Sequence, residues 1–430
     1  MVTIRLDFAV RLGSAVRLRS TILVPIALAL VFVLPAFADS LFAPPTTLKL
    51  PSNAAEPAAI RLADFNGDGN LDIIVLCVSE TADGARGGFN IFLGNGDGTF
   101  QSPVTYLSQR HARTLAVGDF NEDGKLDVFV VNDCLSSGFC NQAVGDLFFG
   151  AGAGTFSAPV SIGFPWAGPL ATATADFNGD GHTDLAITFS GPGITLNPVA
   201  GVVFLGDGHG NFNTGGSFVT NYRPKEPVGL AVADFDQDGK QDIAVLATGF
   251  GYVNLMLGNG DGTFHLKSTR QVGHETAIAA TDFTGDGVPD LVITTQNVVR
   301  VLDGHGDGTF AIPQGLRVAP NASLTRVTTG DFNGDGRNDF ALVDSANSNL
   351  VVYLNQPDGR FREYTFDDGM AGSPGDLAAG DLNNDGALDI LTANNGPTEL
   401  APGSISIFLN QTKAVGSTEQ SVVEGKTEKP

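Results

Sequence analysis

The stretch Asp64-Phe65-Asn66-Gly67-Asp68-Gly69-Asn70-Leu71-Asp72 decides how this chain of 430 residues folds. Closely related stretches begin at Asp119, Asp176, Asp234, Asp282, Asp331 and Asp381, at intervals of 48 to 58 residues. Numbered from the first Asp, every copy has Asp at positions one, five and nine and Gly at position six. Position three is Asn in five copies, Asp236 in the fourth and Thr284 in the fifth. A stretch that recurs seven times indicates a repeat protein, so the length does not imply two or three unrelated domains.

The residues around each acidic stretch carry strand signals. A run of small apolar residues precedes it, as at 115–117, and a β-rich run follows, as at 128–131. A third apolar run, such as 91–93, leads into a Gly- and Asp-rich turn that ends in Phe100, and such turns favour a tight hairpin. A weaker fourth strand leads to the next repeat. Four strands in about 50 residues are typical of a propeller blade, so the sequence predicts an all-β, seven-bladed β-propeller of four-stranded blades.

The two ends of the repeat region complement each other. The seventh repeat stops after its third strand, at 405–409, while Leu41-Phe42-Ala43-Pro44 resembles the fourth-strand opening Phe100-Gln101-Ser102-Pro103. We therefore expect an N-terminal strand to complete blade seven and close the ring, which gives a propeller over residues 39–410. Residues 411–430 are polar and lack periodicity, so we expect a disordered C-terminal tail.

The first 38 residues read as a targeting segment. Arg5, Arg11, Arg17 and Arg19 precede an apolar run over 22–37, which ends in the small-residue pattern Ala36-Phe37-Ala38. This pattern predicts a signal peptide over 1–38 and a secreted or cell-surface protein, with an uncleaved membrane anchor as the alternative. No later stretch is apolar and long enough to span a bilayer, so no membrane association is expected beyond this segment.

The net charge and the cysteines give further indications about the partners and the compartment of the chain. The formal net charge is −23, and loss of residues 1–38, with four Arg and one Asp, makes it −26. Such a chain is not expected to bind nucleic acid, whose phosphates require positive charge. Cys134 and Cys140 either close a small loop as a disulfide, which an oxidising compartment permits, or remain free thiols. Cys77 ends an apolar run and is expected to be a buried small hydrophobe.

The acidic stretches have the composition of a calcium loop. Calcium binds six to eight oxygen atoms, and alternate side chains of a tight loop converge on one point. Position seven would bind through its carbonyl, which agrees with its variable side chain, and Asp at nine takes the closing role. Asx turns without a metal are the alternative, but three carboxylates this close repel one another without a cation. We expect about seven Ca²⁺ ions, bound by these residues: Asp64, Asn66, Asp68, Asn70, Asp72; Asp119, Asn121, Asp123, Lys125, Asp127; Asp176, Asn178, Asp180, His182, Asp184; Asp234, Asp236, Asp238, Lys240, Asp242; Asp282, Thr284, Asp286, Val288, Asp290; Asp331, Asn333, Asp335, Arg337, Asp339; Asp381, Asn383, Asp385, Ala387, Asp389.

The repeated Asp-Phe-Asn-Gly-Asp-Gly-x-x-Asp, together with the hairpin Leu-Gly-Asn-Gly-Asp-Gly-Thr-Phe at 93–100 and 257–264, resembles the FG-GAP/VCBS repeat family. It is similar to the calcium-binding propeller of integrin α-subunits. The resemblance covers roughly residues 41–410. It implies a seven-bladed propeller with calcium between the first and second strand of each blade, and a family that is often adhesive or carbohydrate-binding.

In such propellers partners bind the face opposite the calcium loops. The candidate ligand-binding residues there are His111, Arg113, Trp166, Tyr222, Arg223 and His274. Trp166 either anchors a sugar or protein or simply fills a junction between blades. His111 and His274 occupy equivalent positions and could act as acid and base, but no nucleophile or phosphate-binding motif accompanies them. We therefore expect a monomeric binding or adhesion module for an extracellular protein or glycan, with no catalytic residues. The alternative is a polysaccharide lyase or hydrolase with its active site on that face.

Overall fold

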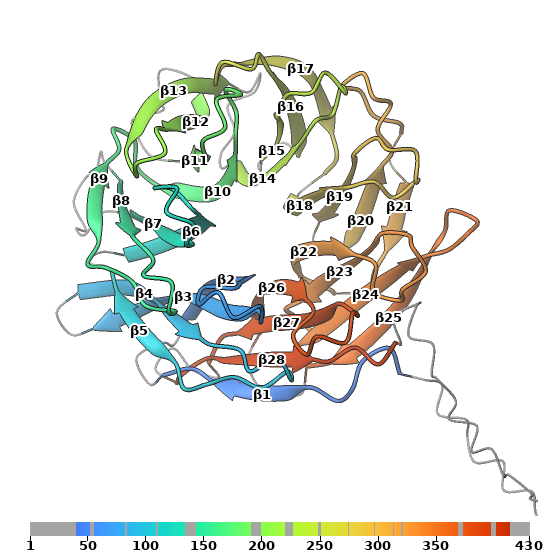
Figure 1. The fold of residues 1–430 in the computed structure, drawn as a ribbon. Helices are drawn as coiled ribbons and strands as arrows, with labels where there is room; N and C mark the ends of the chain where they lie inside the picture. The colour runs from blue at the N-terminus through green and yellow to red at the C-terminus, as the bar shows by residue number, and fades with distance from the viewer. Residues whose placement is uncertain are drawn as a thin grey trace, which may run out of the picture. The chain divides into compact units, whose positions relative to one another are not determined.

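The computed structural model describes residues 40–51, 56–81, 84–108, 111–133, 143–190, 199–219, 227–247, 251–273, 275–295, 297–312, 314–319, 321–368, 373–396 and 401–412. These residues form strands, turns and irregular segments and contain no helix, and thus no apolar helix that could cross a membrane. Seven four-stranded antiparallel sheets follow one another around a ring (Figure 1). The predicted seven-bladed β-propeller is confirmed.

Each blade runs outward from an inner strand to an outer one. Blade one is β2 (Glu56–Ala63), β3 (Asp72–Thr81), β4 (Gly84–Phe92) and β5 (Val104–Leu107). Blade two is β6 (His111–Gly118), β7 (Asp127–Asp133), β8 (Val144–Phe148) and β9 (Val160–Gly163). Blade three is β10 (Pro169–Ala175), β11 (Asp184–Phe189), β12 (Val199–Gly206) and β13 (Phe212–Val219). Blade four is β14 (Pro227–Ala233), β15 (Asp242–Ala247), β16 (Tyr252–Gly258) and β17 (Phe264–Gln271).

The remaining three blades have the same order. Blade five is β18 (Glu275–Thr281), β19 (Asp290–Thr295), β20 (Val298–Leu302) and β21 (Gln314–Arg317). Blade six is β22 (Leu324–Gly330), β23 (Asp339–Asp344), β24 (Asn349–Asn355) and β25 (Phe361–Asp367). Blade seven is β26 (Pro374–Gly380), β27 (Asp389–Asn394), β28 (Ser404–Phe408) and, from the other end of the propeller, β1 (Thr46–Lys49).

The strand β1 pairs antiparallel with β28, with Thr46 opposite Ile407 and Lys49 opposite Ser404. Just before it, Phe42 pairs with Asn410 and is buried with Leu41 in the apolar cluster between blades six and seven. The N-terminal residues thus occupy the outer position of blade seven. That this strand is what keeps the ring closed stays a prediction.

The blades are held together by apolar side chains between their faces. The second strand of each blade is buried on both sides, because a neighbouring blade covers each face of the sheet. The Phe at position two of the acidic loop packs edge-to-face on the hairpin Phe of the next blade, as with Phe65 and Phe156, whose ring centroids are 5.8 Å apart. Phe120 and Phe212, at 5.5 Å, repeat this contact. Both sets of Phe therefore contribute to the packing between blades.

Candidate metal centres

The acidic loops are tight turns whose backbone requires a left-handed residue at position four. Gly67, Gly179, Gly285 and Gly334 fill it in four blades, with φ between 71° and 77°. Glu122, Gln237 and Asn384 fill it in the other three, at φ of 56° to 60°. A left-handed backbone is unfavourable for residues other than glycine, so the surrounding structure must stabilise these three.

The Asp at position one organises the turn. In the first loop Asp64 Oδ1 accepts the amide of Gly67 at 2.7 Å, and Oδ2 accepts that of Gly69 at 2.8 Å. The bond from the Gly at position six recurs in all seven loops at 2.7–2.9 Å. The backbone at position six has φ between 81° and 89° in every loop, which favours Gly there, and its amide bonds to the Asp at position one.

The Asp at position nine has a second role that the sequence analysis missed. Each of these seven side chains is fully buried, and both carboxylate oxygens accept a backbone amide. Asp72 Oδ2 accepts the amide of Phe65 at 2.9 Å, and Oδ1 accepts that of Gly94 at 2.8 Å, which opens the hairpin between the third and fourth strands. The same two bonds occur in every blade. Position nine therefore fastens the acidic loop to the hairpin of its own blade.

Burial changes the acidity of the position-nine carboxyls. Loss of water raises the pKa of Asp339 to about 7 and that of Asp184, Asp242 and Asp389 to about 6, although two amide bonds oppose the shift. Burial raises the pKa of Asp72, Asp127 and Asp290 as well. At position five the backbone amide of Asn70 lowers the pKa of the exposed Asp68 carboxyl. In the third and fourth loops the pKa of the position-five carboxyls Asp180 and Asp238 is lowered as well, by the backbone amide of His182 and by the side chain of Lys240.

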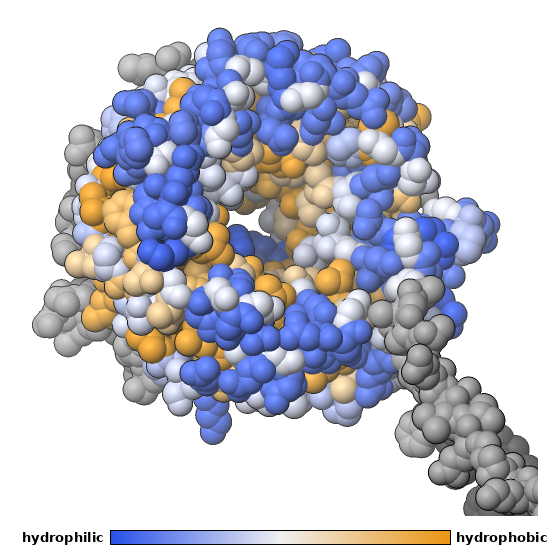
Figure 2. All heavy atoms as spheres, in the orientation of Figure 1, coloured by the Kyte–Doolittle hydropathy of each residue, from blue (hydrophilic) through white to orange (hydrophobic). Residues whose placement is uncertain are grey.

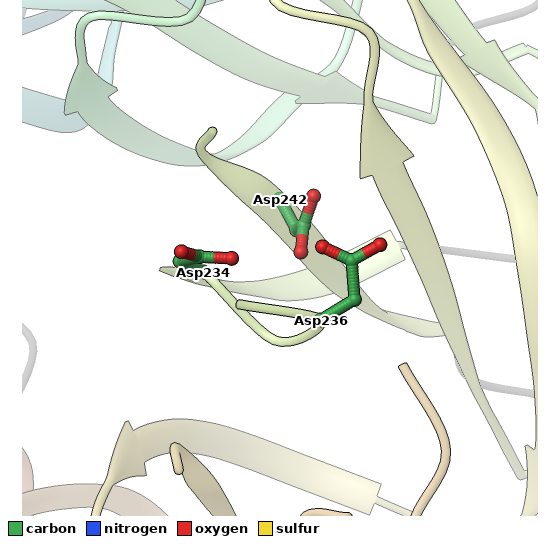
Figure 3. Close-up of side chains that lie close together, drawn as sticks. All are labelled: Asp234, Asp236 and Asp242. Atoms are coloured by element: carbon green, nitrogen blue, oxygen red, sulfur yellow. The ribbon is translucent and has the colours of Figure 1, made fainter. Parts of the chain in front are cut away.

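The fourth loop brings three carboxylates to one point. One oxygen from each of Asp234, Asp236 and Asp242 lies within 4.8 Å of the others (Figure 3). Asp236 Oδ1 is buried and has no hydrogen-bond partner, which is costly for an oxygen that carries negative charge. A hard divalent cation would offset most of this negative charge and use that oxygen, so these residues fit Ca²⁺.

The other loops differ from the fourth at position three. In the first loop the amide Asn66 Nδ2 donates to Asp68 Oδ2 at 2.9 Å, and Asn178, Asn333 and Asn383 repeat this bond. In the fifth loop Thr284 Oγ1 donates to Asp282 Oδ1 at 3.3 Å. These side chains offer a neutral oxygen where Asp236 offers a carboxylate, so the fourth loop has four carboxylates at positions one, three, five and nine, whereas each other loop has three.

The residue at position seven varies, but in three loops its side chain forms an ion pair. Lys125 Nζ lies 3.1 Å from Asp123 Oδ2, and Lys240 Nζ lies 2.6 Å from Asp238 Oδ2. Arg337 pairs with Asp335 in the same way. In blades two, four and six the position-five carboxylate thus has a positive partner within its own loop, which partly neutralises the charge a cation would meet.

The loops are also bonded to the next blade around the ring. A hairpin amide or side-chain amide donates to the position-two carbonyl of the preceding blade's loop, at 2.7–3.2 Å, and we call these the inter-blade bonds. The five backbone donors are Gly98, Gly154, Gly210, Gly262 and Gly308, which bond to Leu382, Phe65, Phe120, Phe177 and Phe235. In blades six and seven Asn355 Nδ2 and Asn410 Nδ2 bond to Phe283 and Phe332 instead. The seven bonds complete a circuit of the ring.

The three left-handed residues other than glycine at position four each contact the acidic loop of the next blade. Asn384 Nδ2 donates to Asn70 Oδ1 at 2.8 Å, and Gln237 Nε2 donates to the Gly287 carbonyl at 3.4 Å. Glu122 pairs with His182, whose imidazole pKa is raised by that carboxylate. Each of these contacts joins one acidic loop to the acidic loop of the next blade, which helps to offset the backbone strain.

The candidate ligand-binding residues do not form one described cluster. His111 and Arg113 lie on β6, where Arg113 Nη2 is 3.3 Å from Asp133 Oδ2. Trp166 packs against Phe189 and Phe204, with ring centroids 5.8 and 6.3 Å away, in the apolar cluster between blades two and three. This placement favours the junction-filling interpretation of Trp166. Tyr222, Arg223 and His274 lie outside the described residues.

Of the three cysteines, one lies within the described residues and two lie outside them. Cys77 is buried and free, as expected, and burial raises the pKa of its thiol to about 12. Cys134 and Cys140, with both interpretations given for them, lie outside the described residues, as do the leader 1–38 and the tail from 413 onward.

Seven four-stranded blades, each with an acidic loop between its first two strands, define the chain as a β-propeller built from one repeated unit. The FG-GAP-like repeat matches residues 64–130, 234–293, 282–342 and 331–392, more than half of the chain, and the FG-GAP repeat matches residues 168–205. The chain belongs to the FG-GAP repeat family.

Among curated proteins, the chain is similar to the T-cell immunomodulatory protein of Homo sapiens, with 24% identity over 258 residues. The match covers 56% of this chain and 39% of that protein, so the chain spans well under half of the length of that relative.

Two solved structures share the fold. One is the crystal structure of BBS1N in complex with ARL6DN, with a TM-score of 0.56, 10% identity, and coverage of 87% of this chain and 99% of the matched chain. The other is an Agrocybe aegerita lectin that recognises non-reducing terminal N-acetylglucosamine, with a TM-score of 0.53, 17% identity, and coverage of 84% and 87%. At these identities the likeness concerns the fold alone.

Proposed function

We propose that this chain is an exported, calcium-loaded β-propeller that serves as a binding module for an extracellular protein or carbohydrate. The observation that carries the calcium assignment is the fourth loop, where three carboxylates meet and one buried oxygen lacks a partner. The other six loops share its backbone geometry, its Asp at one, five and nine and its Gly at six. About seven ions would contribute +14 and offset roughly half of the charge of a chain that has lost residues 1–38.

Calcium would act on the fold and only indirectly on the ligand. An ion that binds only the folded state shifts the folding equilibrium toward it. Because each acidic loop is bonded to its own hairpin and to the next blade, calcium would stabilise the ring as a whole. The binding surface we propose is the opposite face, on which the second strand of each blade connects to the third.

Three considerations support a binding module over an enzyme. The repeat family is one whose members often bind other molecules, the lectin with the same fold recognises a sugar, and a propeller displays loops from many blades on one face. Of the two histidines considered for acid–base chemistry, His111 lies on β6 and His274 lies outside the described residues. No observation favours the lyase or hydrolase alternative over binding.

The proposal is tested in two measurements on the exported chain. Metal analysis after dialysis against millimolar calcium should find about seven ions per chain, and two or fewer would contradict the calcium assignment. A screen of immobilised glycans and extracellular proteins, with calcium and with EDTA, should find a partner that is retained in calcium. Turnover of a polysaccharide in the same screen would instead support the enzyme.

A further inference from the structure

Two arginines and one buried aspartate meet on the inner strands of three successive blades. Arg326 belongs to β22 of blade six, Asp376 to β26 of blade seven and Arg61 to β2 of blade one. We propose that this cluster is a binding site in the central opening for one anionic group, the carboxylate or sulfate of an acidic glycan. The inference deepens the proposed function, because it names a ligand class for the binding module.

The geometry places both guanidinium groups on one carboxylate. Arg61 Nη1 lies 3.2 Å from Asp376 Oδ2, and Arg326 Nε lies 3.4 Å from Asp376 Oδ1. The amide of Ile60 also donates to Asp376 Oδ2, at 3.0 Å. The Asp376 side chain is only 7% exposed, whereas those of Arg61 and Arg326 are 44% and 45% exposed. The aspartate is therefore a buried anchor that holds two partly exposed cations near each other.

The cluster has a surplus of positive charge and of donors. Two guanidinium groups against one carboxylate leave a net charge of +1. Arg61 Nη1, which already pairs with Asp376, also donates to the Ile60 carbonyl, and Arg326 Nη1 donates to the Thr325 carbonyl. For Arg61 Nε and Nη2 and for Arg326 Nη2, no hydrogen-bond partner is found among the residues that the structure describes. These groups are available to an incoming oxyanion.

The exposed parts of both arginines face the central opening. Each residue lies inside an inner strand, whose free edge borders the opening, because neighbouring blades cover the faces of its sheet (Figure 1). In Figure 2 hydrophilic residues interrupt an otherwise largely apolar wall around this opening. Apolar walls focus the field of a charge on the space between them, which favours an anion here despite the net charge of −23.

The inner strands of blades three, four and five differ from this cluster at the equivalent positions. Five residues before the acidic loop, where blades six and seven have Arg326 and Asp376, blades three, four and five have Ala171, Gly229 and Ala277. Three residues before the loop, where blade one has Arg61, these blades have Ala173, Ala231 and Ala279. These inner strands carry no charged side chain at the two positions, so the positive cluster is confined to one part of the ring.

The planar fork of arginine binds carboxylate and sulfate in pairs of parallel hydrogen bonds, so such oxyanions match the available donors. The chain as a whole is strongly acidic, which disfavours a polyanion spread over its surface. A single charged sugar that enters the opening satisfies both conditions, and this is the ligand class we infer.

The test is isothermal titration of the calcium-loaded chain with sodium glucuronate and with sodium sulfate, with glucose and sodium chloride as controls. The variants are Arg61→Gln and Arg326→Gln, and the matched control is Arg360→Gln, an exposed arginine beside Asp358 on a hairpin. At least one oxyanion should bind with one-to-one stoichiometry in the millimolar range, and each cluster variant should weaken it by at least about tenfold. Arg360→Gln should bind like the wild type, and Asp376→Asn, which removes the competing negative charge, should bind more tightly.

The outcomes distinguish a carboxylate ligand from a sulfate ligand. They also distinguish failure of this site from failure of the proposed binding function. Binding of glucuronate alone assigns a carboxylate, and binding of sulfate alone assigns a sulfate ester. The site is refuted if neither anion binds up to about 50 mM, or if both cluster variants bind like the wild type. If a variant does not fold, NMR of the arginine Nε–H signals in the wild type must show two resonances that shift with the anion. A partner found in the glycan and protein screen would survive such a refutation, because that screen does not depend on this cluster.

Discussion

At the scale of single residues, Asp at position nine differs from Asp at position five in what it does without a metal. Asp127 is fully buried and accepts two backbone amides, whereas the Asp123 side chain is 37% exposed. In Asp127→Asn an NH₂ group would face an amide donor. We expect this variant to lose about 1–3 kcal/mol of unfolding free energy in EDTA, and Asp123→Asn to lose stability only in calcium. Denaturant unfolding in both buffers measures this, and equal stability of the two variants in EDTA would contradict the second role of position nine.

The residue at position three should set the order of calcium affinities. Asp236 gives the fourth loop an additional carboxylate, while Thr284 gives the fifth loop only a hydroxyl, which already donates to Asp282. We expect the fifth site to empty first and Thr284→Asp to strengthen it. Chelator titrations of Asp286→Ala and Asp238→Ala, each lacking a ligand in one of these loops, identify the sites. The ordering is wrong if the fourth site empties before the fifth.

At the scale of elements, the inter-blade bonds make neighbouring blades depend on each other. Asn355 is 3% exposed and bonds to the Phe283 carbonyl, at 2.7 Å, and to that of Asn338, at 3.2 Å. Asn355→Ala should therefore cost about 1–3 kcal/mol of unfolding free energy and weaken calcium binding in blade five. The control is Asn259→Ala in the hairpin of blade four, where the Gly262 backbone amide supplies the inter-blade bond. Equal losses of unfolding free energy in both variants would show that the bond to the Phe283 carbonyl makes no special contribution to stability.

The strand β1 offers a second test at this scale. Deleting residues 39–50 removes β1 and the buried side chains of Leu41 and Phe42, which leaves β28 with an unpaired edge. We expect a lower melting temperature and a tendency to associate through that edge. Scanning calorimetry and light scattering measure both effects. A truncated chain that melts like the full chain would show that the ring closes without this strand.

At the scale of the whole molecule, calcium removal should reverse the dependence of stability on pH. The position-nine carboxyls titrate at about 3.9 in the unfolded chain, but burial raises the pKa of Asp339 to about 7 and of three others to about 6. A raised pKa in the folded state stabilises it at low pH, and the contribution is lost as pH rises through 6 to 7. In EDTA the melting temperature should therefore rise by several degrees between pH 8 and pH 5.

The calcium-loaded protein is the control for this prediction. Calcium needs ionised ligands, so protons compete with it and the melting temperature should fall over the same pH range. Scanning fluorimetry in EDTA and in calcium gives both curves. Parallel curves would indicate that these carboxyls are not held by the metal.

The sequence predicted the features that lie within one repeat. The spacing of Asp, Gly and β-rich runs can be seen within a single repeat. The positions of the blades, loops and hairpins could therefore be predicted. The second role of position nine depends on Gly94, which lies 22 residues after Asp72, and was missed. The arginine cluster joins Arg61 to Asp376, 315 residues later, and becomes visible only when the ring brings blades seven and one together. For Trp166 the sequence left both interpretations open, because its spacing carries no sign of the apolar cluster that it joins.

The inter-blade bonds also bear on how such a ring can change its size. Every blade carries both halves of the interaction, a donor in its hairpin and an acceptor carbonyl in its acidic loop. A gene segment copied or lost as one whole repeat would therefore leave each remaining blade with a compatible neighbour on either side. A segment cut between the loop and its hairpin would not. The single repeat, from inner strand to outer strand, is thus the unit in which this architecture can be inherited, duplicated or engineered.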